Sequence, residues 1–219
     1  MAMAVDLPPG PGGVDAAQSA ERQRTRTRLL RAARIIFERD GFRRSRVTDI
    51  AHLGGLAHGG FYRYFDSKET VFLEVAEAAV DRLGTPLDGV AFDSDPLEDL
   101  PDRMRASIRR YLRSYQDGAR ILGVIRETGP KNDQLCGLWR DPWRPDVVRH
   151  VEAIRQLQVR GLIETRVSPQ VIVFALIGMV ERFADRWLVD GAITCDLDVA
   201  VEQLARLSLQ ALRIPDRAA

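Results

Sequence analysis

The stretch that decides the fold is residues 48–72, TDIAHLGGLAHGGFYRYFDSKETVF. It predicts a short helix over about 49–53, a glycine turn at 54–55 and a second short helix over about 58–64. Thr48 is expected to cap the first of these helices. This is helix-turn-helix spacing, in which the second helix can enter the major groove of DNA. An ordinary helical hairpin has the same spacing, so the pattern alone leaves both possibilities open.

Small and apolar residues stand where such a unit needs them. Ala51 is small where the two helices cross, and Gly55, four residues later, can adopt the positive φ of a tight turn. Phe61 is expected to seat the second helix in a small core that Ile50 and Leu56 complete. The unit can therefore fold locally around a few buried side chains.

The flanking segments also have helical patterns. Residues 22–39 place apolar side chains on one face and arginines on the other, and residues 40–41, Asp-Gly, end that helix. Asp66 or Ser67 caps a further helix. Its inward side is expected to include Val71, Phe72, Val75 and Leu83.

Basic residues are concentrated in this N-terminal third. Residues 21–69 contain twelve basic and six acidic residues, whereas the rest of the chain contains 20 and 25, and the formal net charge of all 219 residues is +1. A basic end on an acidic body favours contact with a polyanion such as nucleic acid. A solvated helix surface in an arginine-rich chain would carry the same charge.

Composition and motifs disfavour several classes of protein. Two cysteines, Cys136 and Cys195, are too few for a disulfide framework or a zinc cluster. The longest apolar run, residues 171–180, falls short of the roughly 20 residues that cross a bilayer, and the N-terminus lacks the features of a signal peptide. There is no HExxH, CxxC, GxSxG, P-loop or GxGxxG motif, so we expect a cytoplasmic protein that is not an enzyme, with no metal, cofactor or membrane contact. The histidines have no metal-ligand spacing, and His150 is expected on a helix surface.

Beyond a turn-rich break at 85–96, every segment has a helical pattern. Residues 100–115 carry one apolar stripe, and shorter helices are expected at 119–127 and 135–140. Three further helices are expected at 147–160, at 168–189, which Ser168 and Pro169 begin, and after a cap at Asp196 or Asp198. The sequence therefore predicts an all-α protein of about nine helices.

Residues 26 to about 75 resemble the TetR family of bacterial transcriptional regulators. The resemblance lies in LLRAARIIFERDGF (29–42), in the Thr48, Ile50, Ala51 start, in the FYRYF aromatic cluster and in the Ser67-Lys68-Glu69 step. It implies an N-terminal helix-turn-helix DNA-binding domain followed by an all-helical domain that binds a small molecule and dimerises. The domains are then a disordered leader at 1–19, a DNA-binding domain at 20–66 and a ligand-binding and dimerisation domain at 67–219.

The resemblance also implies which residues contact DNA. The positions that resemble base-contacting ones are His58, Gly59, Gly60 and Tyr62. Those expected at phosphates are Thr48, Tyr64 and Lys68 from the resemblance, with Arg46 and Arg63 added for their charge. Ala57 stands where many relatives have Ser or Thr, so the second short helix is expected to lack a side-chain cap.

The expected partners are a near-palindromic double-stranded operator, a second copy of the chain and an apolar or amphipathic effector. Residues that could line the effector pocket are Tyr111, Tyr115, Trp139, Trp143 and Phe174, with Glu127 and Glu181 as polar anchors. For any one of the aromatic residues taken singly, ordinary core packing is the favoured explanation. The last two helices are apolar on more than one side, which favours a homodimer. The expected function is a ligand-responsive regulator, in the first place a repressor that its effector releases from DNA. The alternative is a helical ligand-binding protein or a protein-interaction adaptor without specific DNA binding.

Overall fold

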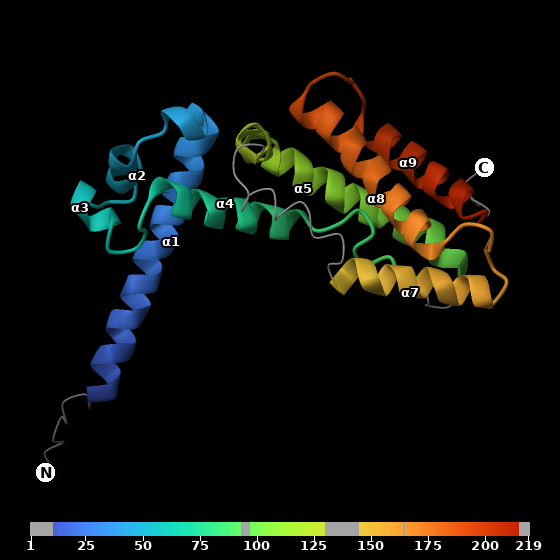
Figure 1. Cartoon of the computed structure of the whole chain (residues 1–219), viewed down its shortest axis with the longest axis horizontal. Helices are drawn as coiled ribbons and strands as arrows, with labels where there is room; N and C mark the ends of the chain where they lie inside the picture. Colours follow the sequence, from blue (N-terminus) through green and yellow to red (C-terminus); the bar gives the residue numbers. More distant parts are fainter. Residues whose placement is uncertain (1–10, 93–96, 130–144, 164, 215–219) are drawn as a thin grey trace, which may run out of the picture. The chain divides into compact units, whose positions relative to one another are not determined.

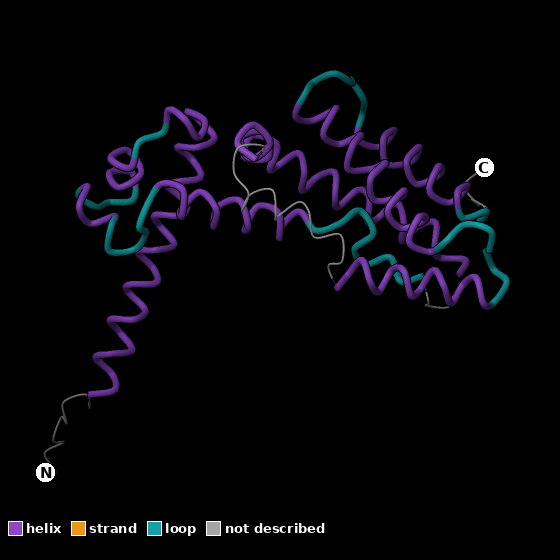
Figure 2. The backbone as a smooth tube through the Cα atoms, in the orientation of Figure 1, coloured by secondary structure: helices purple, strands orange, loops and turns teal. Residues whose placement is uncertain are grey.

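A computed structural model describes residues 11–92, 97–129, 145–163 and 165–214, and the secondary structure in these ranges is entirely helical (Figures 1 and 2). The α-helices are α1 (Pro11–Arg44), α2 (Val47–Leu53), α3 (His58–Phe61), α4 (Lys68–Leu83), α5 (Leu100–Thr128), α7 (Pro145–Val159), α8 (Pro169–Ala184) and α9 (Leu197–Ala211), with a 3-10 helix η1 (Leu97–Asp99) and a π-helix η3 (Asp185–Val189). The predicted all-α class is confirmed, with eight α-helices in the described ranges where about nine were expected in the whole chain. None of the described helices has both the length and the apolar character that a membrane span requires.

The chain divides into two compact units, residues 1–75 and 76–219, and the boundary falls inside α4. In the first unit, α2 packs on α1 and α3 packs on α2. The apolar face of α1 predicted from periodicity is buried, with Leu29 and Phe37 fully inaccessible. Phe37 and Phe42 both contact Phe72 of α4, at ring-centroid distances of 4.9 and 4.7 Å. Such aromatic pairs contribute about 0.5–1.5 kcal/mol each beyond their burial, so they hold the start of α4 against α1.

The first helix differs from its predicted bounds at both ends. It begins at Pro11 instead of residue 22, so residues 11–19 of the predicted disordered leader are helical and the rest of that leader lies outside the described residues. Residues 15–24, DAAQSAERQR, are mostly good helix formers, which explains the extension. Gly41 interrupts the helix at a φ of 73°, as predicted, but helical geometry resumes and continues to Arg44.

Two further predicted bounds were wrong in the helix-turn-helix unit. Thr48 does not cap α2, because the helix already begins at Val47 and Arg46 occupies the N-cap position without a side-chain hydrogen bond. The second short helix ends at Phe61 instead of residue 64, and the chain then passes through a turn. A single turn of helix carrying two glycines has little intrinsic tendency to extend further.

Three predicted helix starts are confirmed by their caps. Ser67 Oγ accepts a hydrogen bond from Thr70 N at 3.1 Å, and Ser168 Oγ accepts one from Val171 N at 3.3 Å. Asp196 Oδ1 accepts from the first backbone N–H groups of α9. Each cap typically stabilises its helix by about 1 kcal/mol.

In the second unit, α5, α8 and α9 contact one another and α7 packs on α8 (Figure 1). The predicted stripe of α5 is buried, including Leu100, Met104 and Ile108. The two helices predicted at 100–115 and 119–127 form one continuous helix, α5, which includes Asp117 and Gly118. The helix expected at 168–189 is α8 followed by η3, and the one expected at 135–140 lies outside the described residues.

A methyl group at Gly54 should destabilise the first unit. A Cβ there would lie 2.6 Å from Leu29 Cδ2 and 3.2 Å from Ile50 O, and Leu29 is fully buried. We expect Gly54→Ala to lower the free energy of unfolding by about 1–3 kcal/mol, measured by chemical denaturation. Gly59→Ala is the matched control, since nothing lies within 4 Å of its Cβ position. Equal stability of the two variants would contradict the close packing inferred at Gly54.

Candidate functional site

The α2–turn–α3 unit is built around a small buried core. Gly54 N donates to Ile50 O at 2.9 Å, and Leu56 N donates to Ala51 O at 2.9 Å, which closes the end of α2. Gly55 has a φ of 77°, as predicted for the tight turn. Ile50, Ala51 and Phe61 are fully buried, whereas Leu56 is half-buried. The predicted core is therefore confirmed, with Leu56 at its edge, and it fixes how α3 is presented.

The predicted base-contacting residues lie on and directly after α3. His58, Gly59 and Tyr62 are exposed, and Gly60 is half-buried against Leu56. The rings of His58 and Tyr62 meet edge to face at a centroid distance of 5.4 Å, which follows from their i, i+4 spacing. The imidazole can donate or accept a hydrogen bond at a base edge, and Gly59 leaves open space beside it for close approach.

The N-terminus of α3 lacks a side-chain cap, as the sequence predicts. Ala57 occupies the N-cap position in extended geometry and has no side chain that can accept a hydrogen bond. A capping Ser or Thr would stabilise the helix by about 1 kcal/mol.

The residues expected to contact phosphates differ in solvent exposure and in whether they bond to other parts of the chain. Arg46, Thr48 and Arg63 are exposed, and neither arginine forms an ion pair or hydrogen bond within the part of the chain that the structure describes. Tyr64 is half-buried. Arg46 and Thr48 lie at the start of α2, and Arg63 and Tyr64 directly follow α3. In the sequence, basic and hydroxyl side chains that can contact phosphates therefore stand both before and after α3.

Lys68 has a structural role that the sequence did not indicate. Its Nζ donates to Phe42 O at 2.8 Å and to Ser45 O at 3.1 Å, and it lies 4.6 Å from the centroid of the Phe42 ring. Two of its three donors are thus directed at carbonyls near the C-terminal end of α1. Arg26 acts similarly: it pairs with Glu74 of α4 and lies over the Phe65 ring at 4.9 Å. Both cations join segments that are distant in sequence.

Residues predicted to contact the effector are partly brought together. Tyr111 and Tyr115 are buried on α5 with ring centroids 5.8 Å apart, and the Tyr115 hydroxyl donates to Asp185 Oδ1 at 3.4 Å. Burial, reinforced by the nearby Glu181 carboxylate, raises the pKa of Tyr111. Its hydroxyl has no hydrogen-bond partner among the described residues. Two other predicted contacts, Glu127 and Phe174, are exposed, and Trp139 and Trp143 lie outside the described residues.

His150 lies in the interior, so its predicted surface position was wrong. It is only 7% exposed and shares the buried face of α7 with Val147, Val151 and Ile154. The Phe92 ring meets it edge to face at 5.8 Å. Burial lowers the pKa of His150, Asp88 and Asp146 oppose this effect, and Arg149 adds to it.

The burial of His150 should make stability depend on pH. Because its pKa is lowered in the folded chain, the unfolded chain binds more protons below the ordinary value of 6.5, so the free energy of unfolding falls as the pH decreases through that value. One such group contributes a slope of at most about 1.4 kcal/mol per pH unit. We expect His150→Gln to remove this contribution in denaturation measurements at several pH values. His52→Gln, which changes an exposed side chain, is the control; an unchanged slope in His150→Gln would refute the assignment.

Removal of the Lys68 amine should weaken the first unit. Lys68→Met keeps the apolar stem but leaves the Phe42 and Ser45 carbonyls without this donor. We expect the free energy of unfolding to fall by about 1–3 kcal/mol. Arg63→Met is the matched control, because that side chain is exposed and unpaired in the described structure. If the two variants unfold alike, the structural role of Lys68 is wrong.

Comparison with known proteins gives one consistent family. Residues 29–75 match the family described as "Bacterial regulatory proteins, tetR family". The chain is 26% identical to the HTH-type transcriptional regulator UidR of Escherichia coli K12 over 191 residues, covering 85% of this chain and 87% of that protein. It is 25% identical to the HTH-type transcriptional repressor BepR of Brucella suis over 206 residues, covering 90% and 95%. A solved TetR-family regulator from Mesorhizobium loti shares the fold, with a TM-score of 0.68, 19% identity and coverage of 86% of this chain and 96% of that one.

Proposed function

Because this chain belongs to the TetR family of bacterial regulatory proteins, we propose that it is a repressor that binds a specific operator as a homodimer and is released by a small effector. The single observation that supports this most directly is the exposed face of α3. There His58, Gly59 and Tyr62 are open, and unpaired arginines stand before and after them in the chain. Residues 20–66 would form the DNA-binding domain, and residues 67–219 would bind the effector and dimerise.

The proposed DNA contacts divide into two kinds. His58 and Tyr62, with the open backbone at Gly59 and Gly60, would read base edges in the major groove. A second set of residues would contact backbone phosphates and so fix the register of the protein on the duplex. Its members are Arg46, Thr48, Arg63, Tyr64 and Lys68. Lys68 would use the one N–H donor that is not bonded to the Phe42 and Ser45 carbonyls.

The proposed dimer uses the exposed apolar side chains of the last two helices. Val171 of α8 is 58% exposed, and Val199 and Leu207 of α9 are about half exposed, at 48% and 51%. Burial of these side chains against a second copy would remove apolar surface from water. A two-fold dimer would present two α3 helices to a near-palindromic operator.

The proposed effector is apolar or amphipathic, and Tyr111, Tyr115 and Glu181 remain candidates for its contacts. Effector binding would lower affinity for DNA only if it favours a conformation that fits the operator less well. The helix α4 is continuous from Lys68, a proposed DNA contact, to Leu83 in the second unit. A shift of α4 could therefore couple the two activities.

Fluorescence anisotropy should detect a sequence-specific complex. A labelled duplex from the region upstream of the gene should bind more tightly than a shuffled duplex, by about 10³-fold or more near physiological salt. The logarithm of the affinity should fall linearly with the logarithm of the salt concentration. A compound that releases the native duplex in the same assay would support the effector response, and failure to bind any duplex at low salt would refute the DNA-binding proposal.

Variants in the same assay separate the two kinds of contact. Arg63→Ala should weaken binding to all duplexes similarly and reduce the salt slope by about 1, whereas His58→Ala should change sequence preference across a randomised operator library. Arg120→Ala, an exposed position on α5, is the charge-matched control and should leave affinity unchanged. Identical behaviour of the Arg63 and His58 variants would contradict these roles.

A further inference from the structure

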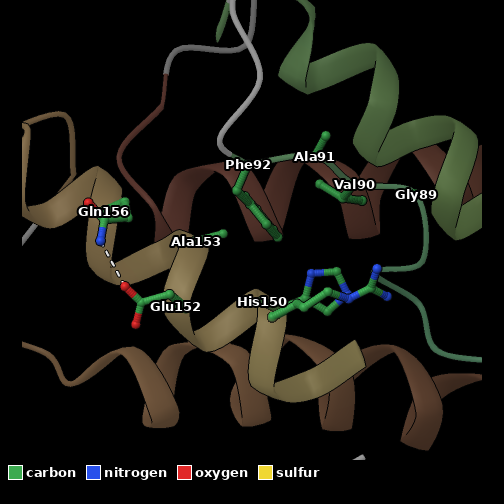
Figure 3. Close-up of a pocket in the computed structure, with 9 residues that line it drawn as sticks. Gly89, Val90, Ala91, Phe92, His150, Glu152, Ala153 and Gln156 are labelled. Carbon is green, nitrogen blue, oxygen red and sulfur yellow. Dashed lines mark hydrogen bonds between the residues drawn. The ribbon is translucent and has the colours of Figure 1, made fainter. Parts of the chain in front are cut away.

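A pocket of about 400 Å³ lies in the second unit between α7 and the loop that follows α4 (Figure 3). The loop contributes residues 89–92, and α7 contributes Arg149, His150, Glu152, Ala153 and Gln156. Among the described residues, none of those that the sequence singled out for the effector lines this pocket. It is therefore a separate candidate site.

The inner wall of the pocket is apolar apart from one ring nitrogen. Val90 and Phe92 are buried at the loop side, and Figure 3 shows them facing His150 and Ala153 of α7. His150 is only 7% exposed, and its Nε2 has no hydrogen-bond partner within the described residues. A buried polar atom without a partner costs about 1–3 kcal/mol, so a ligand that supplies the partner would recover this energy.

The outer rim is polar and already ordered. Gln156 Nε2 donates to Glu152 Oε1 at 2.7 Å, at one end of the pocket (Figure 3). Glu152 Oε2 also pairs with Arg155 at 2.6 Å, and Arg149, the other charged residue of the lining, is exposed to solvent. The charged groups of the pocket therefore lie on its solvent side, and the inner wall can hold an apolar body.

Hydrogen bonds within the loop and from α5 hold the loop wall of the pocket in place. Asp88 accepts from Thr85 N at 2.8 Å and from Thr85 Oγ1 at 3.0 Å, and the Asp88 carbonyl accepts from Ser107 Oγ and from Arg110 of α5. Gly89 then turns the chain at a φ of 74°. A wall that is preformed in this way reduces the entropy cost of binding.

We propose that this pocket binds an uncharged apolar molecule with one hydroxyl group, such as a phenol or an alicyclic alcohol, whose hydroxyl pairs with His150 Nε2. A hydroxyl both donates and accepts, so it satisfies either tautomer of a neutral imidazole. Burial lowers the pKa of His150, which keeps the ring neutral and agrees with an uncharged ligand. The apolar body would lie against Val90, Phe92 and Ala153.

The position of the pocket in the chain suggests how a bound ligand would affect α4. The loop begins directly after Leu83, the last residue of α4, so a ligand held by Val90 and Phe92 would restrain the end of that helix. This regulatory meaning rests on the proposed function, in which α4 couples the effector to DNA binding. The binding site itself is argued from the pocket alone.

The test uses 1-naphthol, with 1-methylnaphthalene as an isosteric probe that lacks the hydroxyl. The chain has three histidines, so the imidazole ¹⁵N resonances of histidine-labelled protein are simple to follow. Saturable binding of 1-naphthol should shift the resonances of His150 and leave those of His52 and His58 unchanged. 1-Methylnaphthalene should bind about tenfold more weakly, because it leaves the ring nitrogen unpaired.

Two variants distinguish the hydrogen bond from the cavity. His150→Phe should lose the preference for 1-naphthol, and Ala153→Trp should fill the pocket and abolish binding of both compounds with His150 still present. His52→Phe is the matched control and should bind like the wild type. Circular dichroism checks folding, and if His150→Phe does not fold, the Ala153 variant decides alone.

Two results would overturn the proposal: no shift of His150 at saturating probe, or unchanged binding when Ala153 is replaced by Trp. The titrations contain no DNA, so their failure would leave the operator experiment unaffected. Conversely, specific binding of 1-naphthol by a chain that binds no duplex would support the pocket and refute the repressor function.

Discussion

The contact between the backbone of Gly54 and the side chain of Leu29 is the constraint on which the DNA-binding unit depends. It lets the end of α2 lie directly on α1, where any side chain at Gly54 would collide with a fully buried residue. The turn at Gly55 and the burial of Phe61 then fix where α3 emerges. A one-turn helix without an N-terminal side-chain cap has little stability of its own, so its presentation relies on this packing.

The start of α4 completes the unit through aromatic and cationic contacts. Phe72 packs against two aromatic rings of α1, and Lys68 and Arg26 each bond to groups that are distant in the sequence. The Lys68 amine has three donors: two bond to the Phe42 and Ser45 carbonyls, and the third is proposed to contact a phosphate. DNA binding and the position of α4 would therefore be linked through this side chain.

The second unit combines an extensive apolar core with a few buried polar groups. Tyr111 and His150 each keep a polar atom without a partner in the described part of the chain, on different helices and in different surroundings. An apolar interior with isolated hydrogen-bonding groups is typical of small-molecule sites. The loop that contains Asp88 follows Leu83, the last residue of α4, and its residues 89–92 line the pocket together with His150.

Local periodicity and backbone preference were enough to predict the all-α class, the position of the helix-turn-helix unit and the positive φ of Gly55. They also predicted the cap at Ser168 and narrowed two others to Asp66 or Ser67 and to Asp196 or Asp198, of which Ser67 and Asp196 form the capping hydrogen bonds. Helix bounds were predicted less well: α2 already begins at Val47, so Thr48 is not its cap, and α3 ends at Phe61, so residues 62–64 form a turn. The partners of Lys68, which lie 26 and 23 residues away in the chain, and the burial of His150 came from tertiary packing. Both depend on which faces of distant helices meet, and a polar residue within a helical pattern does not reveal whether another segment covers it.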